Sequence, residues 1–205
     1  TPKRTRIRNF ALKTLFTSPS KLRFLGRLMR IYQATGLQTA IRKSGFLRLL
    51  PKSLRELEPL TPTISPKFTQ AHFKQLPNSH STKYRVGLIS GCIQDIAFSE
   101  INADTIYVLQ KNECEVVLPQ AQVCCGSLHG HNGEIETAKE LARKNIDAFN
   151  AETFDVIITN AGGCGSHLKQ YDHLLSDDPN YAQRAKIWSS KVKDIHEFLV
   201  EIDFQ

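Results

Sequence analysis

The sequence predicts an α/β protein in which a parallel sheet of β-α-β units follows a basic helical arm. Three short runs of β-branched and aliphatic residues support this prediction, at residues 86–90, 114–118 and 155–159. The stretches between and after these runs have helical character. Strands that alternate with helices form parallel sheets, because each connection crosses over before the next strand begins. We therefore place an α/β domain at residues 84–205.

The predicted arm covers residues 1–58 and contains two helical patterns, at 19–35 and 37–50. Gly36 separates the two patterns, and Pro51 ends the second. Basic side chains stand between apolar residues that recur at helical spacing in the first pattern. These apolar residues are Leu22, Leu25, Leu28, Met29 and Tyr32.

An extended connector is expected at residues 59–83, which are rich in Pro, Thr, Ser and Asn. Helices are then expected at residues 98–112, 134–150, 166–175 and 180–201, the last one capped by Asp177-Asp178-Pro179. For the first two of these helices we expect an inward apolar face. Its members are Ile101, Thr105, Val108 and Leu109 in the first helix, and Ile135, Ala138, Leu141, Ala142 and Phe149 in the second.

Charge divides the chain into two parts. Residues 1–52 contain thirteen Lys or Arg and no Asp or Glu, whereas the chain from residue 61 onward has thirteen basic and eighteen acidic side chains. The chain starts at Thr1 with a basic stretch, so we read it as a piece of a longer polypeptide. It shows no signal peptide and no apolar run of the ~18 residues that a membrane span needs. Five cysteines, an odd number, suit a reducing cytoplasmic setting better than a secreted disulfide framework.

Four cysteines follow the predicted strands, and they are Cys92, Cys124, Cys125 and Cys164. Because the carboxyl ends of parallel strands share one edge of the sheet, these cysteines should meet there. Four thiolates are the ligands of an iron–sulfur cluster or of a zinc ion. Structural zinc sites favour paired Cys-x2-4-Cys knuckles, which the sequence lacks, so we favour the cluster and keep zinc as the alternative. Cys114 begins the second run, where we expect a packed strand residue.

Three further residues stand near the predicted ligands. His129 and His131 follow the cysteine pair, and they either tune the cluster through hydrogen bonds or relay protons, or else bond loop carbonyls. Lys169 lies one turn after Cys164, where it either offsets the negative charge of a cluster or is a solvated helix residue. The sequence shows no Ser/His/Asp arrangement, no P-loop and no Gly-x-Gly-x-x-Gly motif.

The cysteine spacing resembles the cysteine-rich CCG domain. Thirty-one residues separate Cys92 from Cys124-Cys125-Gly126, and thirty-eight separate Cys125 from Cys164. CCG domains occur in heterodisulfide reductases, in lactate-utilisation proteins, in the anaerobic glycerol-3-phosphate dehydrogenases and in glycolate oxidase iron–sulfur subunits. The sequence is most similar to the last of these at residues 90–94, 124–133, 160–171 and 194–199, and in the arm at 32–38 and 49–52.

This resemblance implies an iron–sulfur subunit that performs no substrate chemistry of its own. Electrons would come from a flavoprotein (FAD) subunit that oxidises glycolate to glyoxylate, and would pass toward a membrane acceptor such as quinone, at the inner face of the cell membrane. The full-length family members carry a ferredoxin-like region before the arm and a second CCG half after this one. Ala161 stands where the fuller CCG pattern has another cysteine, which leaves a four-cysteine site, as for a 4Fe-4S cluster.

Other functions remain open at this stage. The chain could belong to a related oxidoreductase that acts on lactate, glycerol-3-phosphate or a heterodisulfide. It could also be part of an enzyme whose cluster performs disulfide chemistry, or it could be a zinc-stabilised interaction module. The basic arm could also bind nucleic acid. We expect no nucleic-acid partner, because leucines at helical spacing between the basic residues suit a membrane surface or a partner's groove better than a phosphate backbone.

Overall fold

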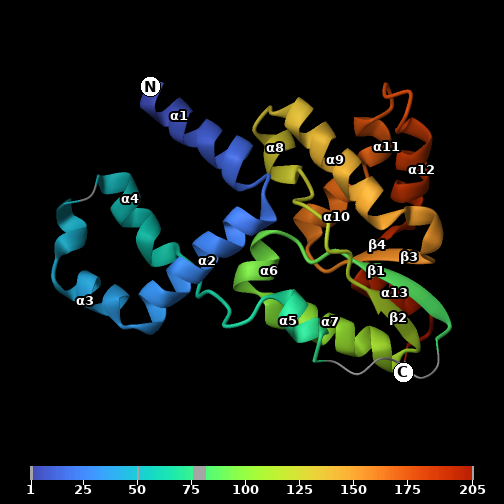
Figure 1. Ribbon diagram of the computed structural model, residues 1–205, viewed down its shortest axis with the longest axis horizontal. Coiled ribbons are helices and arrows are strands. Elements are labelled where there is room, and N and C mark those ends of the chain that lie inside the picture. The colour runs from blue at the N-terminus through green and yellow to red at the C-terminus, as the bar shows by residue number, and fades with distance from the viewer. Residues whose placement is uncertain (1, 50, 76–81, 205) are drawn as a thin grey trace.

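The computed structural model describes residues 2–49, 51–75 and 82–204 (Figure 1). Four parallel strands form one sheet in the order β2-β1-β3-β4. Their bounds are β1 Tyr84–Leu88, β2 Cys114–Val117, β3 Val156–Thr159 and β4 Val192–Asp194. The predicted α/β class and the parallel sheet are thus confirmed, and the three predicted strands are β1, β2 and β3.

The fourth strand contradicts the long helix expected at residues 180–201. That segment divides into α12 (Ala182–Lys191), the short strand β4 and α13 (Ile195–Glu201). Val192 pairs with Ile157 of β3, which adds β4 to the edge of the sheet. Asp194 then begins α13 with a capping box, in which its side chain accepts a hydrogen bond from the His196 amide. Three residues are too few to show the alternation by which a strand is recognised in sequence.

Helices cover both faces of the sheet. On one face, α9 to α12 bury Leu141, Ile146 and Trp188 against Ile157. On the other face, α7 and α13 bury their apolar residues against Leu88 and Ile158. Neighbouring residues of a strand point to opposite faces, so Ile157 and Ile158 belong to two separate cores. The helices of this part are α6 Ile93–Ala97, α7 Ser99–Lys111, α8 Ser127–His131, α9 Ile135–Phe149, α10 Gly162–Leu168 and α11 Tyr171–Leu174.

Several expected helices differ in detail. Ile101 and Ile135 were expected to face inward but are 47% and 45% exposed. The buried face of α7 is formed by Asn102, Thr105, Ile106 and Leu109 and does not include Ile101, and Ile135 is the first residue of α9. The pattern at residues 166–175 belongs to two short helices, α10 and α11. The helix expected at residues 37–50 is interrupted at Gly45. The φ of Gly45 is +73°, which is incompatible with a right-handed helix and which residues other than glycine rarely adopt.

The arm consists of helices, of which α2 (Pro19–Ala34) lies beside α6, whereas α3 (Leu37–Lys43) and α4 (Lys52–Leu57) lie away from the sheet (Figure 1). The arm buries Leu12 and Leu22, each 4% exposed, against the α/β part. The connector is less extended than expected, since it contains the helix α5, whose Thr69 is fully buried; its residues 76–81 lie outside the described ranges. The elements are α1 Pro2–Phe10, a π-helix at Ala11–Leu15, α2 Pro19–Ala34, α3 Leu37–Lys43, a 3-10 turn at Phe46–Leu49, α4 Lys52–Leu57, a 3-10 turn at Glu58–Leu60 and α5 Thr69–Phe73.

No helix within the described ranges is both long enough and apolar enough to cross a bilayer. The division of the chain at residues 58 and 84 into arm, connector and α/β domain stays a prediction.

Candidate metal centre

The four cysteines that follow the predicted strands lie together at the carboxyl edge of the sheet. The Cys92 sulfur interacts with that of Cys124, Cys124 with Cys125, and Cys125 with Cys164. Cys124 and Cys125 are buried, whereas Cys92 and Cys164 are partly exposed. The sulfurs follow one another in a row, and among the described residues no three Cys, His, Asp or Glu side chains surround a single point as the ligands of one ion would. The expected convergence is present, and ligation by these sulfurs stays a proposal.

Cys114 stands apart from this group, as expected. It pairs with Tyr84 at the start of β1, so it lies at the opposite edge of the sheet. Its side chain is fully buried, and its thiol donates to the Asn112 carbonyl at 3.4 Å. Burial raises the pKa of the Cys114 thiol to about 11, which disfavours a thiolate there.

Contacts among the four sulfurs shift their pKa values in opposite directions. The Cys125 thiol donates to the Cys124 sulfur and has the largest effect in lowering the pKa of Cys124. The Cys92 thiol also donates to Cys124 and has the second largest effect. Cys125 also lowers the pKa of Cys164. Donation to Cys124 raises the pKa of Cys92 and of Cys125. These shifts favour the anionic form at Cys124 and Cys164, and the thiolate is the form in which cysteine binds a metal.

His129 links the cysteine group to the arm. Its ring is fully buried, and Nε2 donates to the Leu12 carbonyl at 2.7 Å, because a carbonyl can only accept. Nδ1 has no conventional hydrogen-bond partner, and its interaction with the Cys124 sulfur raises the pKa of His129. One ring nitrogen thus bonds a main-chain carbonyl, which belongs to the arm and not to a loop, and the ring also interacts with a cysteine. A role for His129 in tuning a cluster or relaying protons stays a prediction.

The other two residues expected near the ligands lie farther out. His131 is exposed at the end of α8. Lys169 forms an ion pair with Glu197 at 2.6 Å on the surface, which is the solvated alternative. The sequence reasoning missed His167, whose Nε2 is buried without a hydrogen-bond partner. A Cβ on Gly126 would lie 3.3 Å from that nitrogen, so the ring packs on the turn after the cysteine pair.

Glycines shape the turns beside two of the cysteines. Gly91, just before Cys92, has a φ of +70°, and Gly126, just after Cys125, has a φ of +90°. Other residues rarely adopt this left-handed region. At Gly91 a side chain would also lie 2.9 Å from Cβ of Gln94. Both glycines let the chain turn sharply so that the cysteines enter the same space.

A buried tyrosine fixes the backbone of the cysteine pair. The Tyr171 hydroxyl donates to the Cys125 carbonyl at 2.6 Å, and Asn145 donates to the Cys124 carbonyl at 3.1 Å. The Asn145 amide also contacts the tyrosine oxygen, at 3.2 Å. Tyr171 is fully buried and stacks on Trp188, with ring centroids 5.4 Å apart. No local pattern in the sequence marks Tyr171 or Asn145, because their role depends on contacts between distant helices.

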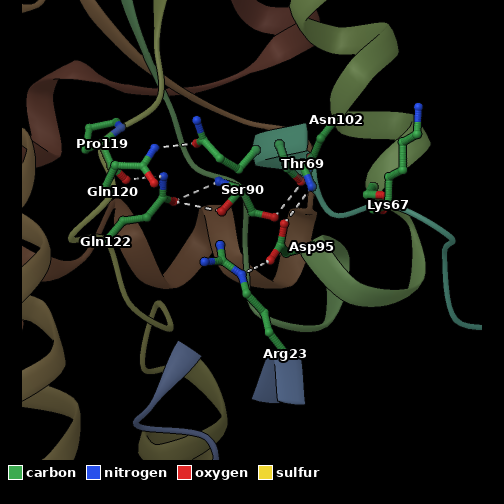
Figure 2. A network of polar contacts seen from close by, with 11 residues as sticks. Arg23, Lys67, Thr69, Ser90, Asp95, Asn102, Pro119, Gln120 and Gln122 are labelled. Atoms are coloured by element: carbon green, nitrogen blue, oxygen red, sulfur yellow. Dashed lines mark hydrogen bonds and ion pairs between the residues drawn. The ribbon is translucent and has the colours of Figure 1, made fainter. Parts of the chain in front are cut away.

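A buried polar network supports the Cys92 turn (Figure 2). The Ser90 amide donates to the Gln122 side chain at 2.9 Å, and the Ser90 carbonyl accepts from Asn102 at 2.9 Å. Asn102 also accepts from Asn160, which directly follows β3. One amide side chain thus joins the turn that carries Cys92 to the turn that leads to Cys164.

The same network reaches the arm through Asp95, as Figure 2 shows. Asp95 is 3% exposed and accepts from the Arg23 guanidinium at 2.8 Å and from the Thr69 amide at 2.9 Å. Thr69 in turn accepts from Asn102 at 2.8 Å. A basic residue of α2 therefore contributes to the support of the cysteine edge.

This donor set fits an anionic sulfur-ligated cluster. Four sulfurs lie in contact, and two buried ring nitrogens, His129 Nδ1 and His167 Nε2, lack hydrogen-bond partners among the described residues. His167 Nε2 can donate to the sulfur of a cluster from a neutral ring, whereas His129 Nδ1 can donate only from a protonated ring, because Nε2 of His129 already donates to Leu12. Hydrogen bonds of this kind help to set the reduction potential of a cluster.

Comparison with known families identifies both parts of the chain. Residues 86–169 match the cysteine-rich CCG domain, and residues 3–61 match the linker region of the glycolate oxidase iron-sulfur subunit. Residues 86–169 are thus similar to a cysteine-rich CCG domain. The matched range includes all four cysteines of the sheet edge, and the linker match corresponds to the predicted arm.

Curated relatives agree with this assignment. The chain is 46% identical over 199 residues to a Bacillus subtilis protein named "Probable glycolate oxidase iron-sulfur subunit", a match that covers 97% of this chain and 45% of the relative. It is 33% identical over 118 residues to lactate utilization protein A of Bacillus cytotoxicus and of Bacillus thuringiensis, in each case over 58% of this chain and 48% of the relative. The chain thus spans about half the length of these relatives. No solved structure shows significant similarity to it.

Proposed function

We propose that this chain holds an iron–sulfur cluster of the 4Fe-4S type and transfers electrons as part of a glycolate oxidase. Cys92, Cys124, Cys125 and Cys164 would be its ligands. The observation that carries the proposal is the contact among these four sulfurs, which come from three separate turns at one edge of the sheet. The CCG match over the same residues supports it.

When bound, such a cluster accepts and releases single electrons, and the chain sets the conditions under which this occurs. Cys124 and Cys125 are buried, so their sulfurs lie away from bulk water. Tyr171 and Asn145 hold the backbone of the pair. His129 presents its second ring nitrogen beside Cys124 while its other nitrogen stays bonded to the arm.

The electron path follows from the name of the relative and is part of the proposal. A flavoprotein (FAD) subunit would oxidise glycolate to glyoxylate and pass electrons to this chain, which would pass them on toward quinone at the inner face of the membrane. The chain would perform no chemistry on glycolate itself. The resemblance to lactate utilization protein A makes a lactate-oxidising complex the second candidate.

The test is reduction of the cluster by substrate in the assembled complex. We expect addition of glycolate under anaerobic conditions to change the EPR signal of the complex, and we expect the Cys164→Ser variant to lose that change. Cys114→Ser is the matched control and should keep it. A complex that responds to lactate and not to glycolate would favour the second candidate. A complex whose cluster responds to neither substrate would contradict the proposed function.

A further inference from the structure

A cavity with five basic residues among the eleven that line it lies between the arm and the connector. It has a volume of about 690 Å³ and is bounded by α2 on one side and by residues 65–74 on the other. Five of its lining residues are cationic, and none is acidic. They are Arg23, Arg27, Arg30, Lys67 and Lys74.

The three arginines lie on one side of α2. Positions 23, 27 and 30 are four and three residues apart, which places them on the same face of a helix. Arg30 donates to the Ile64 carbonyl at 3.2 Å, and Arg27 lies over the Phe68 ring, 5.7 Å from its centroid. These contacts hold two guanidinium groups at the cavity before any ligand arrives.

The positive charge of the cavity is largely uncompensated. Arg23 pairs with Asp95, but within the described part of the chain the other four cations form no ion pair. Lys67 contacts the neutral side chain of Gln75 at 3.0 Å. Residues 76–81, which follow α5 and are not described, include no Asp or Glu in the sequence. Like charges gathered around one cavity repel each other, and a bound anion would relieve that repulsion.

We propose that this cavity binds a small molecule with two linked phosphate groups. Arginine side chains match phosphate oxygens with paired hydrogen bonds, and lysines add point charges. A cavity of about 690 Å³ has the size of a site for a nucleotide-sized ligand. Apart from the Arg23–Asp95 pair, the cavity has four positive charges, and a ligand with a single carboxylate would neutralise only one of them. The charge therefore favours a compact ligand with several negative charges.

The cavity is separate from the cysteine group but adjacent to it. Arg23 also lines the small cavity that contains Cys92 and Cys124. A bound phosphate would therefore approach the Arg23–Asp95 pair that supports the Cys92 turn. Binding itself does not require a metal cluster, so the site can be tested independently of the proposed function.

The experiment is isothermal titration calorimetry of the full chain with ADP and with pyrophosphate at 0.15 M salt. We expect both probes to bind and the Arg27→Gln/Lys74→Gln double variant to bind at least tenfold more weakly. Both substituted side chains are exposed, so the variant should fold. Lys21→Gln is the control, because Lys21 is an exposed cation of the same helix outside this cavity.

Three results would overturn the proposal. Binding that falls equally in the Lys21→Gln control would show general attraction to a basic surface. Binding of an oligoglutamate peptide without binding of either phosphate probe would assign the cavity to an acidic protein segment. A lack of binding by both probes to the unsubstituted chain, with its fold verified by circular dichroism, would exclude the site.

Discussion

Individual cysteines of this chain differ in what surrounds them. Cys124 is buried among sulfurs that lower its pKa, whereas Cys114 is buried among apolar residues, and its pKa is raised to about 11. The sequence predicted this difference, because position relative to a strand separates the two residues. It did not predict Tyr171 or His167, because their positions depend on how α10 and α11 pack against the cysteine pair.

Substitution of the cysteines should separate ligands from packing residues. Cys92→Ser, Cys125→Ser and Cys164→Ser in the full-length protein should each lower iron and sulfide content, since each removes one sulfur of the group. Cys114→Ser should leave iron content close to that of the unsubstituted protein, because a serine hydroxyl can also donate to the Asn112 carbonyl. Colorimetric iron and sulfide assays give the comparison. Equal iron loss in Cys114→Ser and Cys125→Ser would refute the ligand assignment.

His129 provides a second test at this scale. His129→Phe removes the donor to the Leu12 carbonyl, and we expect it to lower the free energy of unfolding by about 1–3 kcal/mol. His129→Gln keeps an N–H donor and should lose less. Urea denaturation followed by circular dichroism measures both variants. A glutamine variant as unstable as the phenylalanine variant would show that this hydrogen bond is not what stabilises the ring's position.

The helices α7 and α9 and the strands β1 to β3 were predicted from sequence, whereas β4 and α5 were not. α7 and α9 begin and end within one or two residues of the expected bounds. β4 is three residues long and depends on pairing with β3, and α5 depends on burial of Thr69 against Asp95 and Asn102. Such elements are set by contacts between distant parts of the chain, which a local pattern does not contain.

The Arg23–Asp95 pair is one of the contacts between the arm and the α/β part. Asp95→Ala removes the acceptor of both the Arg23 guanidinium and the Thr69 amide, and we expect a loss of about 2–4 kcal/mol in the free energy of unfolding. The more exposed pair between Arg42 and Glu58 is the comparison, and Glu58→Gln should cost less than about 1 kcal/mol. Denaturation curves give the free energy of unfolding of both variants. Similar decreases in the two variants would contradict a structural role for Asp95.

At the scale of the whole molecule, the basic arm covers the cysteine edge of an acidic α/β part. Leu22 of α2 lines the small cavity that contains Cys92 and Cys124. The sequence predicted a basic helical arm that suits a membrane surface or a partner's groove. Burial of Leu12 and Leu22 beside the cysteines did not follow from the sequence, because their spacing fits any apolar partner equally well.

Substitution of Leu22 tests whether the arm shields the cysteines. Leu22→Ala leaves a gap over the cavity, so we expect Cys92 and Cys124 in metal-free protein to react faster with iodoacetamide, and we expect a stability loss of about 2–4 kcal/mol. Leu28 lies on the same helix and is 48% exposed, which makes Leu28→Ala the matched control. Mass spectrometry locates the alkylated residues. Unchanged alkylation of both cysteines in Leu22→Ala would show that the arm does not restrict access to them.

The central claim is that the four cysteines hold an iron–sulfur cluster. Anaerobic purification of the protein, followed by iron, sulfide and zinc analysis and EPR spectroscopy, tests it most directly. The account predicts iron and sulfide in equal amounts, little zinc, and an EPR signal that appears or disappears on reduction and is absent from Cys125→Ser. Stoichiometric zinc without iron and sulfide, with no EPR signal in either redox state, would contradict it.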